Sequence, residues 1–398
     1  MSTDREIYVP DSWCVPLYNK PSIKLRERIA DWMTKTGLAS KTLAQKAVEK
    51  LNPFQYMNIL FPKVDLSDSS AARLYEINAA LIVGGYTADD VIETYSLEAL
   101  KELDYFFRST EAWVAKLEPS DYPTVKEIAE SLSEFEMEMS YSKAVICMFI
   151  DSFNQYCYEI WRAHSVSFSK MSQFRRRLSA SVTAYLEIAM ETRRGDANID
   201  EKEFLWQRSA DNLGFPVLML TEVLSGLLNN ECEIPLVTLH YFHMYSNLFA
   251  HVLNDMNSYH RDIHTDHNSI VKLWKKKGIA IDFDDAATKV KVVQFLNSVT
   301  KHMQKSFKKV QQDYPNCLAL RKFLENISYT FTGWVLVHST AVERYKLSPY
   351  QANLVKVEPN GEEEWLEDDS EFGNRCVQMF DQLLCERENE MVFLYGLE

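Results

Sequence analysis

The chain contains 398 residues, of which 46% are hydrophobic and 12% are aromatic. This is enough apolar material to bury a large core. A formal net charge of −14 at pH 7 argues against nucleic acid or an anionic membrane surface as the main partner, because both are themselves negatively charged. No apolar run is long enough for a transmembrane helix, so we expect no membrane span.

Cysteine usage and the N-terminus bear on the compartment. The seven cysteines show no CxxC spacing, which predicts reduced core residues in a cytosol-like environment. The N-terminal residues lack the basic and apolar regions of a secretory signal. We therefore expect a cytoplasmic monomer or homodimer. A plastid location would require a transit peptide that was removed from this chain.

Hydrophobic periodicity predicts a nearly all-helical protein. Pro10, Pro16 and Pro21 make residues 1–22 an expected extended arm, and few glycines or prolines interrupt the rest. Apolar residues then recur at helical spacing. We expect the main helices at 95–117, 124–140, 141–165, 170–193, 200–229, 235–263, 282–312 and 317–346.

An acidic pair, Asp89-Asp90, follows shortly after the Gly84-Gly85 pair. We expect the two glycines to break a helix. Thr87 would then cap the next one, and the two acids would lie in its first turn, where the helix dipole favours negative charge. This interpretation makes Asp89 and Asp90 dipole residues rather than metal ligands.

The composition changes after Tyr350. Seven acidic residues crowd between Gly361 and Gly373, and such a charge block is typical of a solvated segment. We therefore divide the chain into the arm at 1–22, one domain at 23–350 and an acidic C-terminal extension at 351–398.

A possible metal site lies in the helix expected at 235–263. Asn254, Ser258 and Asp262 recur at steps of four residues, so they share one helix face. An amide oxygen, a hydroxyl and a carboxylate form a hard ligand set suited to Mg²⁺. Arg261 lies beside them and is suited to bidentate binding of a phosphate.

Two further groups of residues flank this helix at characteristic distances. Upstream lies the run Trp206-Gln207-Arg208-Ser209-Ala210-Asp211-Asn212. Downstream lies Arg344-Tyr345, preceded by Trp334 on the same expected helix. Together with Asn254, Ser258 and Asp262, these groups resemble the class I terpene synthases. That family carries a diphosphate-sensing Arg, an Asn/Ser/acid metal motif and an Arg-Tyr pair in this order and at this spacing.

The resemblance covers roughly residues 50–350. It implies an all-α bundle of long helices around an aromatic-lined cavity, and Mg²⁺-assisted ionisation of an allylic prenyl diphosphate. Metals and guanidinium groups stabilise the charge that develops on the leaving diphosphate. The implied roles are Mg²⁺ binding by the three residues of the metal motif and contact with the diphosphate by Arg208, Arg344 and Tyr345. Asp211 would link Arg208 to the following backbone, and Asn212 stands where many members have a small residue.

The family also carries an aspartate-rich first metal motif, which the spacing places near Ala115. The expected helix at 95–117 contains no acidic pair, and Asp89-Asp90 lies too far upstream to match. One face of this helix instead carries charged residues at steps of three and four, which we expect to look into the cavity. The positions at this spacing are Asp104, Arg108, Glu111, Ala115 and, just beyond the helix, Glu118, and all but Ala115 are charged.

A guanidinium beside a carbocation is unfavourable in a cyclase, where aromatic faces shelter the cation. It would suit a second, anionic substrate. The chain is therefore similar to the algal glutamate N-prenyltransferases of domoate and kainate biosynthesis, in which this motif is remodelled. The resemblance implies transfer of a prenyl group, geranyl favoured, to the amine of L-glutamate.

On this hypothesis Arg108, with Lys143 or Arg162, binds the glutamate carboxylates. Glu111 binds the remaining metal or accepts the ammonium proton, with released diphosphate as the alternative base. The prenyl slot would be lined by Phe107, Trp113, Phe149, Phe153, Tyr156, Phe249 and Trp334.

Two other functions stay open. The first is a monoterpene or sesquiterpene cyclase with a degenerate first motif. The second is a non-catalytic descendant that binds isoprenoids, or a protein partner through the acidic tail.

Overall fold

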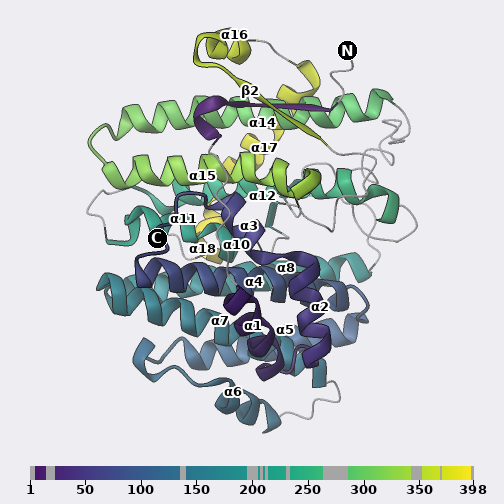
Figure 1. The fold of residues 1–398 in the computed structure, drawn as a ribbon, viewed down its shortest axis with the longest axis vertical. Helices are drawn as coiled ribbons and strands as arrows, with labels where there is room; N and C mark the ends of the chain where they lie inside the picture. Colours follow the sequence, from purple (N-terminus) through teal and green to yellow (C-terminus); the bar gives the residue numbers. More distant parts are fainter. Residues whose placement is uncertain are drawn as a thin grey trace.

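Long helices dominate the computed structural model of the chain (Figure 1), which confirms the expected all-α class. The structure describes residues 5–14, 23–134, 140–194, 205–206, 209–210, 214–229, 234–262, 286–341, 352–367 and 370–395. The N-terminal half contains α1 (Ile23–Lys35), α2 (Lys41–Leu51), α3 (Pro53–Leu60), α4 (Ser69–Ile92), α5 (Leu97–Val114), α6 (Val125–Ser131), α7 (Ser140–His164) and α8 (Phe168–Arg194). The rest contains α10 (Phe215–Leu218), α11 (Leu220–Ser225), α12 (Leu236–Asp262), α14 (Ala286–Asp313), α15 (Leu318–Leu336), α16 (Glu362–Glu367), α17 (Glu371–Glu386) and α18 (Glu388–Tyr395), with two strands, β1 (Glu6–Pro10) and β2 (Asn353–Val357).

Most of the long helices have the expected positions, and three differ. The helix expected at 124–140 ends at Ser131 and continues as a 3-10 turn. The helix expected at 200–229 includes two short helices, α10 and α11, and α11 ends at Gly226, which has a φ of 81°. The helix expected at 317–346 is α15, which passes at Val337 into a π-helical turn with a kink at Ser339.

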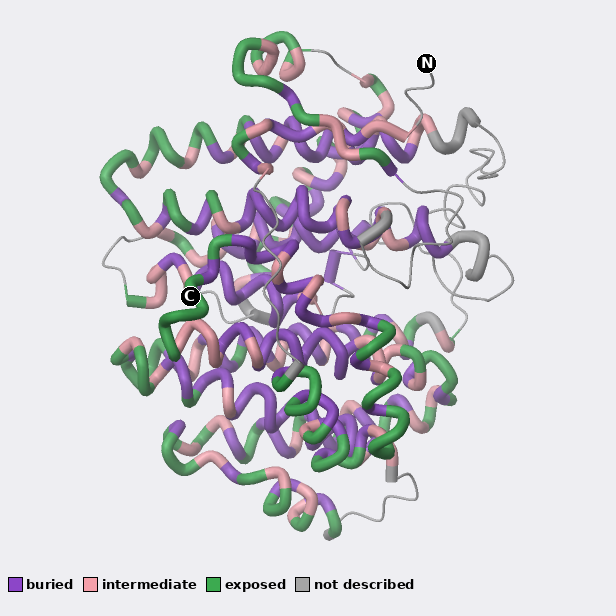
Figure 2. Tube along the Cα trace, in the orientation of Figure 1, coloured by how far each residue is buried: buried purple, intermediate pink, exposed green. Residues whose placement is uncertain are grey.

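The core lies along the helices in the middle of the molecule, as the buried residues in Figure 2 show. Helix α4 packs against α1, α3, α7 and α10, while α12 packs against α14 and α15. Gly333 permits the close packing of α15 on α3, because a Cβ atom there would lie 3.0 Å from the Ile59 carbonyl oxygen. No described helix is both long and apolar enough to cross a membrane.

The predicted helix break at Gly84-Gly85 is wrong. Helix α4 runs without interruption through both glycines to Ile92, because its packing outweighs their low helix propensity. Thr87 does not cap a new helix; its hydroxyl donates to the Val83 carbonyl, 2.8 Å away in the preceding turn. Asp89 and Asp90 consequently lie in the last turn of α4 and not in a first turn.

The N-terminal residues are held on the body of the protein. Strand β1 pairs in parallel with β2, with Glu6 opposite Asn353, and Ile7 and Val9 are fully buried. Asn297 of α14 binds β1 as a neighbouring strand would: its amide donates to the Glu6 carbonyl (3.0 Å) and its oxygen accepts from the Tyr8 amide (2.8 Å). The expected arm is thus an anchored strand over these residues.

The C-terminal helices also pack on the body. Helix α17 lies along α14, and Gly373 allows this because a Cβ atom there would lie 2.6 Å from the Gln294 carbonyl oxygen. Asp381 of α17 accepts hydrogen bonds from Tyr241 (2.8 Å) and Tyr245 (2.7 Å) of α12. The division at residue 350 into separate units stays a prediction, but residues 371–386 contribute to the core.

The cysteines follow the expectation of reduced core residues only in part, since Cys385 is exposed and Cys14 is half-buried. Five cysteines in the described part of the chain are free, and Cys147, Cys157 and Cys376 among them are buried. Cys317, at the start of α15, is disulfide-bonded. The prediction that every cysteine is reduced is therefore wrong.

Replacing Asn297 with Ala should lower the free energy of unfolding by about 1–3 kcal/mol, because two backbone groups of β1 lose their partners. Lys305→Ala, an exposed position on the same helix, is the matched control and should have little effect. Urea unfolding measures both. Equal stability of the two variants would show that Asn297 does not anchor the strand.

Candidate active site

Helix α12 carries the expected metal ligands on its C-terminal half. Asn254 is partly buried, and Ser258 is 3% exposed. The Ser258 hydroxyl has no hydrogen-bond partner among the described residues, although an unsatisfied buried polar group costs about 1–3 kcal/mol. A buried oxygen without a partner suits a ligand of a hard cation such as Mg²⁺. The side chains of Arg261 and Asp262 lie outside the described residues.

A second acidic group, which the sequence prediction rejected, lies at the end of α4. The run Asp89-Asp90-Val91-Ile92-Glu93 ends this helix, with Glu93 as its C-cap. The C-terminal end of a helix carries partial negative charge, so three acids there oppose the dipole. The sequence signal was present: two adjacent acids are followed by a third, and the first and third share a helix face.

Helix α8 contacts this acidic end of α4. The Tyr185 hydroxyl donates to Asp89, with an oxygen–oxygen distance of 2.6 Å. Arg193, in the last turn of α8, donates to the carbonyl of Tyr95 (3.2 Å) and to that of Glu93. The carboxylate of Asp89 is therefore held in place, and the arginine binds carbonyl groups at the end of the helix.

The segment that contains the predicted diphosphate-binding Arg208 is described only in part. Trp206 is 7% exposed, and Ser209 donates to its carbonyl (2.8 Å). The guanidinium of Arg387, at the end of α17, lies 4.8 Å from the centre of the Trp206 ring, a cation–π distance. The C-terminal helices thus contact the predicted diphosphate-binding segment. Four other predicted site residues lie outside the described residues: Asp211, Asn212, Arg344 and Tyr345, as does Arg208 itself.

Glu111 forms part of a buried ion pair. Its carboxylate accepts two bonds from Arg175 of α8, at 2.5 and 3.2 Å, and one from Ser179. The remaining guanidinium nitrogen of Arg175 donates to Asn154 (2.8 Å), and its plane lies over the Tyr122 ring. Breaking a buried pair of this kind costs about 3–5 kcal/mol, so the arrangement favours a structural role for Glu111 over metal binding.

The cations expected to bind glutamate are dispersed. Arg108 is bound by Asp104 (2.8 Å) and by Glu187 of α8 (2.7 Å), and its side chain is 45% exposed. Arg162 pairs with Glu159 one turn away. Lys143 and Arg162 stand near opposite ends of α7, roughly 28 Å apart at 1.5 Å per residue. At most one of these two α7 residues could therefore share a small substrate with Arg108, whose guanidinium already pairs with two carboxylates.

Most of the expected slot aromatics are buried between the helices. Phe149 of α7 contacts Phe107 of α5 and Phe153, with ring centroids 6.3 and 6.2 Å away. Trp334 of α15 is also buried, and its indole donates to the Ser246 hydroxyl of α12 (3.1 Å). Tyr156 and Phe249 are fully buried as well. Trp113 differs, since it is 39% exposed and does not belong to this buried group.

A buried network supports α11, next to these residues. Arg177 of α8 makes two bonds to Glu222 of α11, at 2.8 and 2.5 Å. His243 of α12 lies 3.5 Å from the same carboxylate and contacts the Thr221 hydroxyl (3.2 Å). Burial lowers the pKa of His243 to about 4, and Arg177 adds to this effect while Glu222 opposes it. Within the described residues, no three His, Cys, Asp or Glu side chains converge on a metal site.

No protein-family model matches the sequence, and a search of curated proteins finds no match. Several solved structures do match. The SVS_A2 protein from ancestral sequence reconstruction is 11% identical with a TM-score of 0.55, over 96% of this chain and 97% of that one. The 2-methylisoborneol synthase from Streptomyces coelicolor A3(2), in complex with Mg²⁺ and 2-fluoroneryl diphosphate, is 15% identical with a TM-score of 0.57, over 85% and 99%.

A variant of cucumene synthase is 14% identical with a TM-score of 0.53, over 80% of this chain and 95% of that one. The fold is that of a class I terpene synthase. This agrees with the resemblance in the motifs. At these identities the likeness concerns the fold alone.

Stability should fall as the pH drops from 6.5 to 4. The pKa of His243 is near 4 in the folded chain and 6.5 in a free side chain, so the unfolded state binds a proton first; this residue then accounts for up to about 3 kcal/mol. The His243→Gln variant should show a weaker pH dependence in urea unfolding. Some dependence should persist because burial lowers the pKa of His240 as well. An unchanged pH dependence would contradict the prediction.

Proposed function

We propose that the protein is an Mg²⁺-dependent enzyme that ionises an allylic prenyl diphosphate, with geranyl diphosphate as the favoured substrate. The observation that carries this proposal is the acidic end of α4. The end of α4 supplies Asp89, Asp90 and Glu93. Helix α12 supplies the buried hydroxyl of Ser258, which has no partner among the described residues. Carboxylate, amide and hydroxyl oxygens are the ligands that Mg²⁺ prefers.

Each helix would hold part of the metal set. On α4 the ligands would be drawn from Asp89, Asp90 and Glu93, which do not converge on one ion by themselves, and on α12 they would be Asn254, Ser258 and Asp262, so the metal set would be completed only between the two helices. Bound Mg²⁺ would neutralise the charge that develops on the leaving diphosphate. Arg208, Arg261, Arg344 and Tyr345 would donate to the diphosphate oxygens. This assignment replaces Glu111 as the proposed ligand opposite α12, because Glu111 is already paired with Arg175.

We propose further that the prenyl cation reacts within its own chain, as in a monoterpene or sesquiterpene cyclase. The buried aromatic groups around Phe107, Phe149 and Trp334 suit this chemistry, since π faces stabilise a cation. They also exclude water, which would capture the cation. The enzyme would then be a carbon–oxygen lyase.

Transfer to L-glutamate is the competing proposal. It rests on the missing first metal motif and on Arg108 as a cation that faces the cavity. The acidic end of α4 now offers a first motif, and Arg108 is bound by two carboxylates. Neither observation favours an anionic second substrate. The non-catalytic alternative has less support still, because acids at the negative end of a helix and a buried hydroxyl like that of Ser258 lower stability without a benefit to isoprenoid binding alone.

The Asp90→Asn and Ser258→Ala variants should each lower the rate of diphosphate release from geranyl diphosphate by about 10²–10³, the range seen when one stabilising group is removed. Asp313→Asn is a matched control, because Asp313 is also an exposed acid in the last turn of a helix. It should keep wild-type activity. Full activity of Asp90→Asn would exclude Asp90 as a metal ligand, and full activity of the double variant Asp89→Asn/Asp90→Asn would exclude the α4 site.

Products should separate the two proposals. Incubation with geranyl or farnesyl diphosphate and Mg²⁺ should release diphosphate and form a cyclic hydrocarbon or alcohol, at the same rate with or without L-glutamate. Gas chromatography and mass spectrometry identify these products, and liquid chromatography detects an N-prenyl amino acid. Turnover only in the presence of glutamate would instead establish the transferase, and no turnover under any condition would contradict both.

A further inference from the structure

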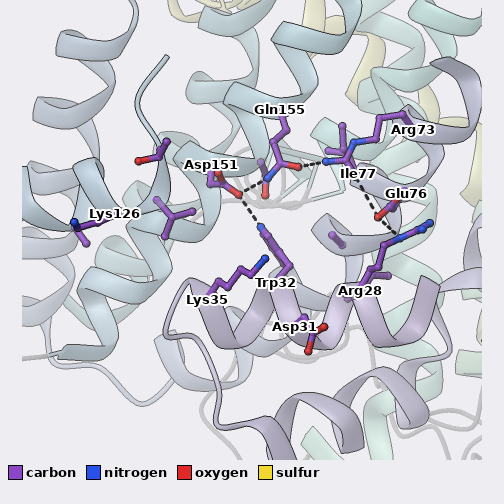
Figure 3. A pocket seen from close by; sticks show the side chains of 16 residues that line it. Arg28, Asp31, Trp32, Lys35, Arg73, Glu76, Ile77, Lys126, Asp151 and Gln155 are labelled. Carbon is purple, nitrogen blue, oxygen red and sulfur yellow. Dashed lines mark hydrogen bonds and ion pairs between the residues drawn. The ribbon is translucent and has the colours of Figure 1, made fainter. Parts of the chain in front are cut away.

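A separate cavity opens among the N-terminal helices, and the residues assigned to the metals and the diphosphate are not among those that line it. It has a volume of about 830 Å³ and opens between α1, α4, α6 and α7 (Figure 3). Small-molecule sites in proteins have volumes of about 300–1,000 Å³. Of these helices, α4 also contributes to the candidate metal site, through its acidic end.

One wall of this cavity is a continuous hydrogen-bonded chain. The Trp32 indole donates to Asp151 Oδ2 (2.8 Å), and the Gln155 amide donates to the same oxygen. The Gln155 carbonyl in turn accepts from Arg73 (2.5 Å), which pairs with Glu76 (3.1 Å). Figure 3 shows these contacts running along the wall. Each polar group of the wall is therefore fixed before any ligand arrives.

The floor of the cavity is apolar. Ile29 of α1 and Ile77 and Ala80 of α4 are buried beneath it. Val125 and Ala129 of α6 cover it from the other side and are partly exposed. A ligand body that lies here must be apolar, because polar atoms in contact with these side chains would lose hydrogen bonds to water.

The rim carries more positive than negative groups, in a chain whose net charge is −14. The cations are Arg28, Lys35, Arg73 and Lys126, and the acids are Asp31, Glu76 and Asp151. Arg28 and Arg73 are engaged by Glu76. Lys35 makes no ion pair within the described residues, and Lys126 has a loose, exposed pair with Glu130 at 3.6 Å. Two ammonium groups are thus available to a ligand.

We propose that this cavity binds a small amphipathic anion. Its apolar body would lie on the floor formed by Ile29, Ile77 and Ala80, and its carboxylate or phosphate head would meet Lys35 and Lys126. Asp151 does not oppose such a head strongly. Its Oδ2 atom is engaged by Trp32 and Gln155, and Lys35 and Arg73 counter its charge.

Calorimetric titration of the full chain, without Mg²⁺, tests this proposal. The two probes are decanoate and geranyl monophosphate, which present the same chemistry with different heads. Decanol and decylamine test the need for an anion. We expect at least one anionic probe to bind and both controls to bind more weakly. Equal or tighter binding of decanol or decylamine would overturn the proposal, as would no binding of either anion.

Two variants locate the site. Lys35→Glu/Lys126→Glu should weaken binding of the anion by about tenfold or more, the effect of losing charge-assisted hydrogen bonds. The control is Lys46→Glu/Lys50→Glu, a double charge reversal at exposed positions of α2 outside the cavity, which should bind as the wild type does. Ala129→Trp should block binding by filling the cavity. Wild-type affinity in the Lys35/Lys126 variant or in Ala129→Trp would overturn the proposal.

Discussion

The negative end of α4 is the constraint on which the proposed active site depends. Asp89, Asp90 and Glu93 end a helix whose dipole repels them, and the middle of this helix, from Leu74 to Gly85, is mostly buried in the core. The surrounding structure offsets this cost. Tyr185 donates to Asp89, and Arg193 binds carbonyl groups at the helix end. Acidic residues that dedicated partners hold at a position unfavourable to stability are typical of a cation-binding site.

Long-range contacts hold the helices around this site. The buried pairs Arg175–Glu111 and Arg177–Glu222 connect α8 to α5 and α11. Replacing such a pair with apolar residues of similar volume is often neutral or stabilising, whereas removing one partner leaves an uncompensated buried charge and costs about 3–5 kcal/mol. At the other end of the chain, α17 binds α12 and α14 through Asp381, and Arg387 stacks on Trp206. The terminal residues thus contribute to the region that the resemblance assigns to diphosphate binding.

Local periodicity was sufficient to predict much of the fold and one side of the candidate site. The helices α7, α8, α12 and α14, and the face of Asn254 and Ser258, follow from spacings within one helix. The other features of the fold and of the candidate site depend on contacts between residues far apart in the sequence. Packing keeps α4 helical through Gly84, so Asp89 lies in the last turn of this helix and not in the first turn of a new helix. The Glu111 carboxylate, which the sequence predicts to bind metal, instead pairs with Arg175, 64 residues away in the chain. A pairing over this distance in the sequence cannot be predicted from the spacing within one helix.

The metal ligands themselves give the most direct test. A crystal of the protein with Mn²⁺ in place of Mg²⁺ and geranyl thiolodiphosphate as an unreactive substrate would show the metals by anomalous scattering. We expect peaks bonded to Asp89 or Asp90 of α4 and to Asn254 and Ser258 of α12, with the diphosphate between them. Metal peaks at Glu111, or none on α4, would contradict this assignment.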